Sequence, residues 1–139
     1  MARVSIRRKQ GRGVILADLL HQLVRASPDF EGAVLVNTDG LVMAADWPTD
    51  DQDHSGDPSA DVGAVATRAF ELSSQATEAL ERGDLSRLIL LGSKGNMVIT
   101  RAGHLALCVV LLKPQAKIGI ASFEADRISR QIAEIVSEL

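Results

Sequence analysis

Hydrophobic residues along this chain switch between a helical and a strand-like spacing. From Val14 to Ala26 they recur every three or four positions, which predicts an amphipathic helix. Ser27-Pro28 ends it, because a residue before proline is disfavoured in the helical region. A short apolar run then enters the turn Asn37-Thr38-Asp39-Gly40, and a second run, Leu41 to Ala45, leaves it. An Asp-Gly turn between two apolar runs predicts a β-hairpin.

A second helix and three further strands follow, and another helix closes the chain. Gly83-Asp84 ends the middle helix. Short turns around Gly95 and Gly103 separate the three strands that come next. The predicted ranges are Asp61 to Arg82 for the helix, Leu85 to Leu91, Asn96 to Thr100 and Leu105 to Leu112 for the strands, and Lys117 to Leu139 for the last helix.

Two of these strands are apolar on both alternations, so both faces of the sheet need cover. We therefore expect helices on both faces of an antiparallel sheet. The predicted fold class is α/β (α+β), with five strands sandwiched between helices in the order α-β-β-α-β-β-β-α. The chain length of 139 residues is compatible with one domain, which we place at 14–139.

Two charged segments lie outside this pattern. Residues 1–13 form a basic arm, which we expect to be flexible. A frayed terminus is the commoner explanation, and a tail that touches an acidic partner or a membrane is the alternative. Residues 46–61 hold six Asp and two Pro, which predicts an acidic loop. This loop lacks the spacing of a calcium-binding hand, so a solvated loop is the better interpretation.

Composition narrows the possible partners. The formal net charge is -3 and aromatic residues make up 3% of the chain, which argues against nucleic-acid binding. A single cysteine, Cys108, suits a reducing compartment. The longest apolar run is too short to span a bilayer, and no signal peptide is recognisable. We therefore expect a cytoplasmic protein without an integral membrane segment.

The sequence offers no self-contained catalytic machinery. It has no glycine-rich phosphate-binding motif and no nucleophile elbow. His21, His54 and His104 show no zinc-ligand spacing with Cys108. Most carboxylates lie in the acidic loop or on polar helix faces, where catalytic groups rarely sit. We expect no catalytic residue, no metal and no cofactor, and hence a protein that is not an enzyme.

The sequence leaves two questions open, namely what the apolar arc of the middle helix packs against and where Phe123 lies. The apolar arc of the middle helix is wider than one sheet face requires, and small residues occupy its centre. Either the whole arc packs on the sheet of this chain, or part of it packs on a partner helix. Phe123 falls on the polar side of the last helix, so it is either an exposed ring or part of a non-helical entry segment.

The order of elements, together with three segments, resembles the Roadblock/dynein light-chain family. The segments are LVNTDGLVMAA, RLILLGSKGNMVITRAGHLALCVVLL and KIGIASFEADRISRQIAEIV. The best local matches are Thr38-Asp39-Gly40-Leu41 and Ile118-Gly119-Ile120. The resemblance runs from Val14 to Leu139 and implies a profilin-like sheet, with the middle helix on one face and the terminal helices on the other.

The resemblance also implies a homodimer that forms through the middle helix and the strand after it. An apolar edge strand without charges is an aggregation hazard unless it is paired, which agrees with this implication. The residues expected at the dimer interface are Val62, Val65, Ala66, Ala69, Leu72, Ser73, Ala76, Leu80, Leu88 and Leu90.

Prokaryotic relatives implied by this resemblance regulate or scaffold small Ras-like GTPases, and some raise GTP hydrolysis. The expected function is therefore a non-catalytic homodimer that binds a small Ras-like GTPase or another protein. The alternatives are a structural adaptor dimer in a motor or signalling complex, and a small-ligand sensor, which would need a pocket with converging polar groups.

Overall fold

The computed structural model describes residues 2–48 and 57–137, with side chains from residue 11 onward. Three helices and five strands follow one another in the predicted order. The helices are α1 (Ala2–Arg25), α2 (Ser59–Ala79) and α3 (Ile118–Val136). The strands are β1 (Phe30–Asn37), β2 (Val42–Asp46), β3 (Arg87–Gly92), β4 (Gly95–Ala102) and β5 (Ala106–Leu112).

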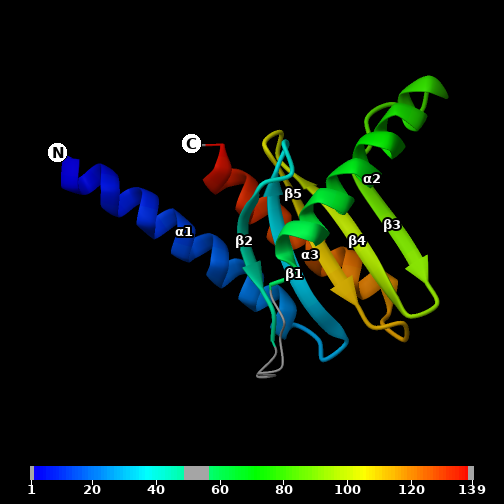
Figure 1. The fold of residues 1–139 in the computed structure, drawn as a ribbon, viewed down its shortest axis with the longest axis horizontal. Helices are drawn as coiled ribbons and strands as arrows, with labels where there is room; N and C mark the ends of the chain where they lie inside the picture. The colour runs from blue at the N-terminus through cyan, green and yellow to red at the C-terminus, as the bar shows by residue number, and fades with distance from the viewer. Residues whose placement is uncertain (1, 49–56, 138–139) are drawn as a thin grey trace.

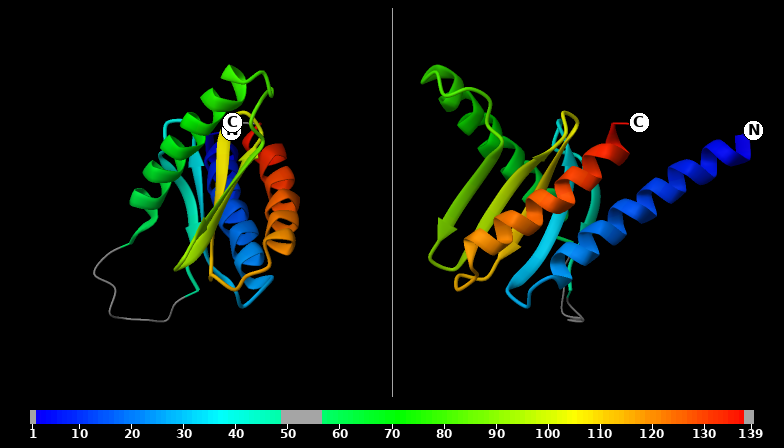
Figure 2. Two further views of the ribbon diagram at one scale, coloured as in Figure 1. Left: turned by 90° about the vertical axis from the view of Figure 1, so that its right-hand side faces the viewer. Right: turned by 180° about the vertical axis from the view of Figure 1, so that it is seen from behind.

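The strands form one antiparallel sheet in the order β2-β1-β5-β4-β3. Figure 1 shows β2 and β3 at the two edges, and Figure 2 shows three layers with α2 on one face and α1 and α3 on the other. The predicted fold class and the distribution of helices over the two faces are therefore confirmed.

Each face of the sheet has its own hydrophobic core. Alternate residues of β1 and β5 point to opposite faces, as the two-residue repeat of a strand requires. Leu35 and Cys108 belong to the larger cluster with α1 and α3, whereas Val34 and Val109 belong to the smaller cluster with α2. β5, in the middle of the sheet, is therefore covered on both sides.

Helix α1 begins twelve residues before the predicted start. It runs through most of the stretch that we expected to be a flexible arm, so that expectation is corrected to a helix for residues 2–13. This segment lacks proline and is rich in Arg, Lys and Gln, which favour helices. The destabilising contribution of Gly11 and Gly13, roughly 1 kcal/mol each, does not break the helix.

Two other expectations concern the loop and the last helix. Trp47, Pro48, Asp57 and Pro58 connect β2 to α2, and residues 49–56 of the expected acidic loop lie outside the described part of the chain. Phe123 lies inside α3 and is 67% exposed, so it is an exposed ring. Among the described helices, none combines the length and apolarity needed to cross a bilayer.

Candidate interaction surface

Strand β3 leaves one of its backbone edges without a strand partner. It pairs with β4 from Arg87 opposite Thr100 to Gly92 opposite Gly95, and it is the last strand in the sheet order. No charged residue lies between Leu88 and Gly92. Native edge strands are commonly blocked by charges, prolines or bulges, and β3 has none of these within that stretch. Its outer edge is therefore free to pair with another strand.

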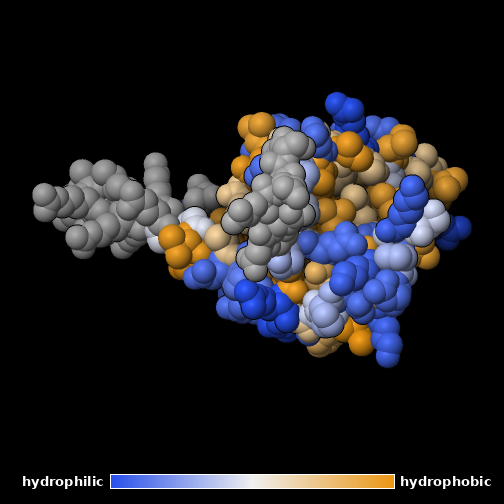
Figure 3. Space-filling view, turned by 60° about the horizontal axis from the view of Figure 1, so that its bottom comes forward, coloured by the Kyte–Doolittle hydropathy of each residue, from blue (hydrophilic) through white to orange (hydrophobic). Residues whose placement is uncertain are grey.

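Both faces of β3 also carry exposed hydrophobic side chains. Leu90 lies opposite Met97 and shares the face covered by α2, whereas Ile89 lies opposite Val98 of the α1–α3 core. Ile89 and Leu90 are each 40% exposed, and Leu91 is 72% exposed. In Figure 3 the orange, hydrophobic side chains are more frequent in the upper half of the view than in the lower half, where blue, hydrophilic ones predominate.

Helix α2 is anchored to the sheet only by its N-terminal half. Its buried residues end at Phe70, and from Glu71 to Ala79 none is buried. Gly63 allows the close approach, because a Cβ there would lie 2.6 Å from Cγ1 of Val36. The principal contacts of α2 are with β1, β2 and β5, and Figure 1 shows its C-terminal end extending beyond the sheet.

The predicted apolar arc of α2 therefore divides into two parts. Ala66 is fully buried and Val62 packs against the same cluster, so these two belong to the core of this chain. The remaining helix positions follow a spacing of three or four residues along the outer side. Val65, Leu72, Ala76 and Leu80 are exposed, and Ala69, Ser73 and, on β3, Leu88 are half-buried.

Sequence reasoning missed a contact between α2 and β4. Phe70 is buried, and the guanidinium of Arg101 on β4 lies 5.0 Å from the centroid of its ring. Nε of Arg101 also donates a hydrogen bond to the carbonyl oxygen of Leu85, at 3.1 Å. The i, i+4, i+8 spacing of Val62, Ala66 and Phe70 was the available signal for Phe70.

A small polar network closes the connection between β2 and α2. Nε1 of Trp47 donates to Oγ of Ser59 at 2.8 Å, and this hydroxyl donates to Oδ1 of Asp57 at 2.6 Å. The hydrogen bonds that Asp57 accepts from the hydroxyl and from the backbone N–H of Ser59 lower the pKa of this carboxyl from 3.8, since they favour its ionised form. The ring of Trp47 covers Gly32, where a Cβ would collide with it.

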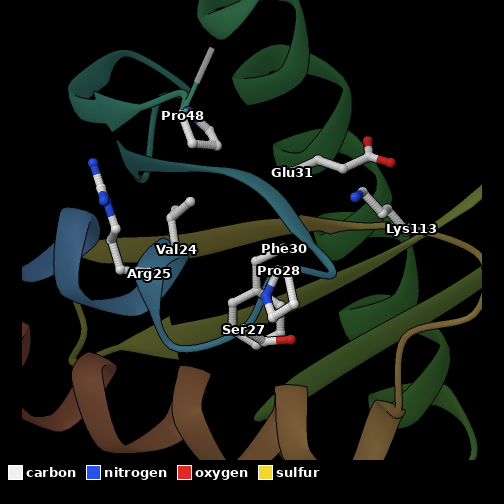
Figure 4. Close-up of a pocket in the computed structure, with 8 residues that line it drawn as sticks. All are labelled: Val24, Arg25, Ser27, Pro28, Phe30, Glu31, Pro48 and Lys113. Carbon is white, nitrogen blue, oxygen red and sulfur yellow. The ribbon is translucent and has the colours of Figure 1, made fainter. Parts of the chain in front are cut away.

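A hollow of about 690 Å³ lies beside the C-terminal end of α1, with Val24, Phe30 and Pro28 among its apolar lining residues. Its charged residues are Arg25, Glu31 and Lys113. Figure 4 shows Arg25 on one side and Glu31 with Lys113 on the other, so the charged groups do not converge on one point. This arrangement gives little support to the small-ligand alternative.

The described residues offer no evident nucleophile or metal site. Burial raises the pKa of the Cys108 thiol to about 12, because the thiolate is poorly solvated in the core. His104 lies in the exposed turn before β5. No group of three or more His, Cys, Asp or Glu side chains is arranged to hold a metal within residues 11–48 and 57–137.

Several solved structures share this fold. MglB in a tetrameric arrangement matches with a TM-score of 0.81 and 16% identity, over 91% of each chain. The gliding protein MglB from Thermus thermophilus matches with a TM-score of 0.78 and 18% identity, over 94% of this chain and 93% of that one. A Roadblock/LC7 domain from Streptomyces avermitilis matches with a TM-score of 0.75 and 21% identity, over 87% of this chain and 97% of that one.

The search of curated proteins returned no match. The family comparison is informative, because the model of the Roadblock/LC7 domain matches residues 16–111. This range begins within α1 and ends within β5, so it contains the whole sheet except Leu112. The chain therefore belongs to the Roadblock/LC7 domain family.

Proposed function

We propose that this protein is a homodimeric, non-catalytic module that binds and regulates a small Ras-like GTPase. The observation that carries the proposal is the uncovered state of β3, which is apolar on both faces and unpaired along its outer edge. A partner strand on this edge would satisfy the backbone groups and cover Leu90 and Leu91. A second copy of the chain offers such a strand.

In the proposed dimer, β3 of one protomer pairs with β3 of its partner and the two sheets join. Such a two-fold contact is self-complementary, so the same residues face one another from both sides. The outward stripe of α2, from Val65 through Leu72 to Leu80, then lies near the joined edge. Its exposed apolar side chains and its small residues Ala69 and Ala76 favour close packing of two helices.

The GTPase part of the proposal rests on the family resemblance and on the shared fold with MglB proteins. A domain without an evident nucleophile or metal site among its described residues would act through binding, by stabilising one conformation of its partner's switch loops. Such an effect requires different affinities for the GTP-bound and GDP-bound partner.

Two measurements on the full chain test this proposal. Sedimentation equilibrium measures the mass, and we expect twice the chain mass of 14.8 kDa at micromolar concentration. Pull-down and GTP-turnover assays then use a small Ras-like GTPase encoded beside this protein, loaded with either nucleotide. We expect tighter binding of the GTP-loaded form and a changed rate of hydrolysis.

The outcomes separate the parts of the proposal. A monomer at millimolar concentration would contradict the dimer. Dimerisation together with equal binding of both nucleotide states would contradict regulation and favour a structural adaptor. A dimer that binds the GTPase in neither state would remove the GTPase from the proposal altogether.

A further inference from the structure

Charge is distributed unevenly between the beginning of α1 and the rest of the chain. Residues 2–13 contain five basic side chains and no acidic one, namely Arg3, Arg7, Arg8, Lys9 and Arg12. The chain has 15 basic and 18 acidic residues, so the part outside residues 2–13 contains ten basic residues and all 18 acidic ones. The first half of α1 is thus a cationic element attached to an anionic body.

The structure places this cationic segment on a projecting helix. Figure 1 shows the N-terminal half of α1 extending away from the sheet, at the end of the molecule opposite β3. Twelve helical residues extend for about 18 Å. A projecting helix can bring its positive charge close to an anionic surface while the acidic body stays farther away, where salt screens its repulsion.

Exposed hydrophobic residues adjoin the cationic segment. Val14 is 60% exposed and Ile15 is 48% exposed, although both lie in the same helix as the buried residues Leu16 and Leu20. Side chains of this kind gain free energy at a bilayer interface, where the acyl chains lie just beneath the headgroups. The phosphates of a nucleic acid, or an acidic protein surface, would attract the positive charge but leave the apolar pair unused.

We propose that the N-terminal half of α1 docks this protein on an anionic membrane surface, with Val14 and Ile15 at the bilayer interface. This inference goes beyond the proposed function and does not depend on a GTPase. Docking at this end also leaves β3 and the outer side of α2 accessible, because they lie away from the projecting helix (Figures 1 and 2).

The test is co-sedimentation of the full chain with vesicles of phosphatidylcholine alone and with about 30% phosphatidylserine. We expect binding only to the anionic vesicles, with weaker binding at about 500 mM than at about 50 mM salt. Each basic residue near an anionic surface contributes a factor of about five in affinity, so the triple variant Arg7→Gln, Arg8→Gln, Lys9→Gln should bind about 100-fold more weakly.

A matched control removes the same number of charges elsewhere. Arg68 on α2 is exposed, as are Lys113 and Lys117 in the connection between β5 and α3, and replacement of these three residues by Gln should reduce vesicle binding far less. A third variant, Val14→Ser with Ile15→Ser, should weaken the binding that persists at high salt. Circular dichroism and the measured mass verify that each variant remains folded and assembled.

The inference would be overturned by no binding to anionic vesicles at low salt, by equal losses in the two triple-charge variants, or by equal binding to neutral vesicles. Tighter binding to RNA than to anionic vesicles, lost in the triple variant of α1, would identify a nucleic acid and not a membrane as the partner. None of these results changes the expectation for the dimer or the GTPase.

Discussion

The sheet ends in β2 on one side and in β3 on the other, and the chain protects these two edge strands differently. β2 has five residues, and both α1 and α2 contact it. Its last residue, Asp46, forms a hydrogen bond of 3.0 Å with His21 on α1. β3 has six residues, and Leu90 and Leu91 in its C-terminal half are exposed. The turn that follows β3 lies away from the C-terminal end of α2 (Figure 1).

This difference shows how one edge of a sheet can be protected against pairing with another strand while the opposite edge remains available for it. Helices contact β2 on both faces, and the carboxylate of Asp46 lies at the C-terminal end of this strand. The edge of β2 therefore accommodates another strand poorly. β3 offers unpaired backbone groups and apolar faces together. Substitutions on the two strands therefore allow a direct comparison, because similar changes should have different consequences.

The largest effect is expected from Leu90→Asp. In the proposed dimer this change places a carboxylate from each protomer in an apolar contact, so we expect roughly 100-fold weaker dimerisation or more, on the order of 3 kcal/mol. Sedimentation equilibrium measures the dissociation constant. A variant that remains a dimer at micromolar concentration would contradict the role of β3.

The matched control is Val42→Asp on β2, where the side chain is 39% exposed. It should leave the dimer intact. Reaction of Cys108 with a thiol reagent at mildly alkaline pH reports whether either variant has lost its fold, since this thiol is buried and has a pKa of about 12. Protected Cys108 in a monomeric Leu90→Asp variant would show that only the association was lost.

A smaller effect is expected from Leu72→Glu on the outer side of α2. Leu72 is 69% exposed, so a folded protomer accommodates the change, while a helix-to-helix contact would lose apolar area and gain charge repulsion. We expect roughly tenfold weaker dimerisation, about 1.4 kcal/mol. Gln75→Glu adds the same charge off the stripe, and equal effects of the two changes would exclude a specific α2 contact.

Ser59→Ala tests the polar network at the end of β2. The change removes the acceptor of the Trp47 N–H, so we expect about 1 kcal/mol less stability in urea unfolding at neutral pH. Ser93→Ala, in the exposed turn after β3, is the control and should have little effect.

The same variant has a defined pH dependence. The folded pKa of Asp57 is lower than its ordinary value of 3.8, so its contribution to stability is complete above that value and is lost as the pH falls through the folded pKa. The difference in the free energy of unfolding between wild type and Ser59→Ala should therefore become smaller below about pH 4. A difference that grows on acidification would contradict the assignment.

The smallest effect is expected from His21→Gln. The pair between His21 and Asp46 is solvent-exposed on the His side, where 49% of the side chain is accessible. Exposed pairs of this kind contribute a few tenths of a kcal/mol. Thermal unfolding should shift by about 1–2 °C at most. A loss above about 1 kcal/mol would mean that this pair, and not the covering helices, secures β2.

Local patterns in the sequence predicted most of the fold and only part of the surface. The hairpin at Asp39-Gly40 and the three closely spaced strands follow from turn residues and apolar runs, which act over a few positions. The start of α1 could not be predicted in the same way, because two glycines and five basic residues resemble a frayed terminus in composition. Propensity alone does not resolve that case.

The division of α2 between core and surface depends on tertiary geometry. Periodicity places Val62, Val65 and Leu72 in one broad arc, and only the angle of the helix over β1 and β5 decides which of them is covered. Phe70 is buried because Arg101 and the sheet lie beneath it, and both are distant from it in sequence. The sequence by itself therefore leaves the choice between core packing and partner packing open.

The overhanging half of α2 has a consequence for how assembly and folding are linked. Beyond Phe70 no residue of the helix is buried, and a helical segment of about nine residues is marginal by itself in water. A partner that covers the last turns of α2 would also stabilise their helical conformation. In the proposed homodimer, helix order in these turns and dimer formation would therefore increase together as the protein concentration rises.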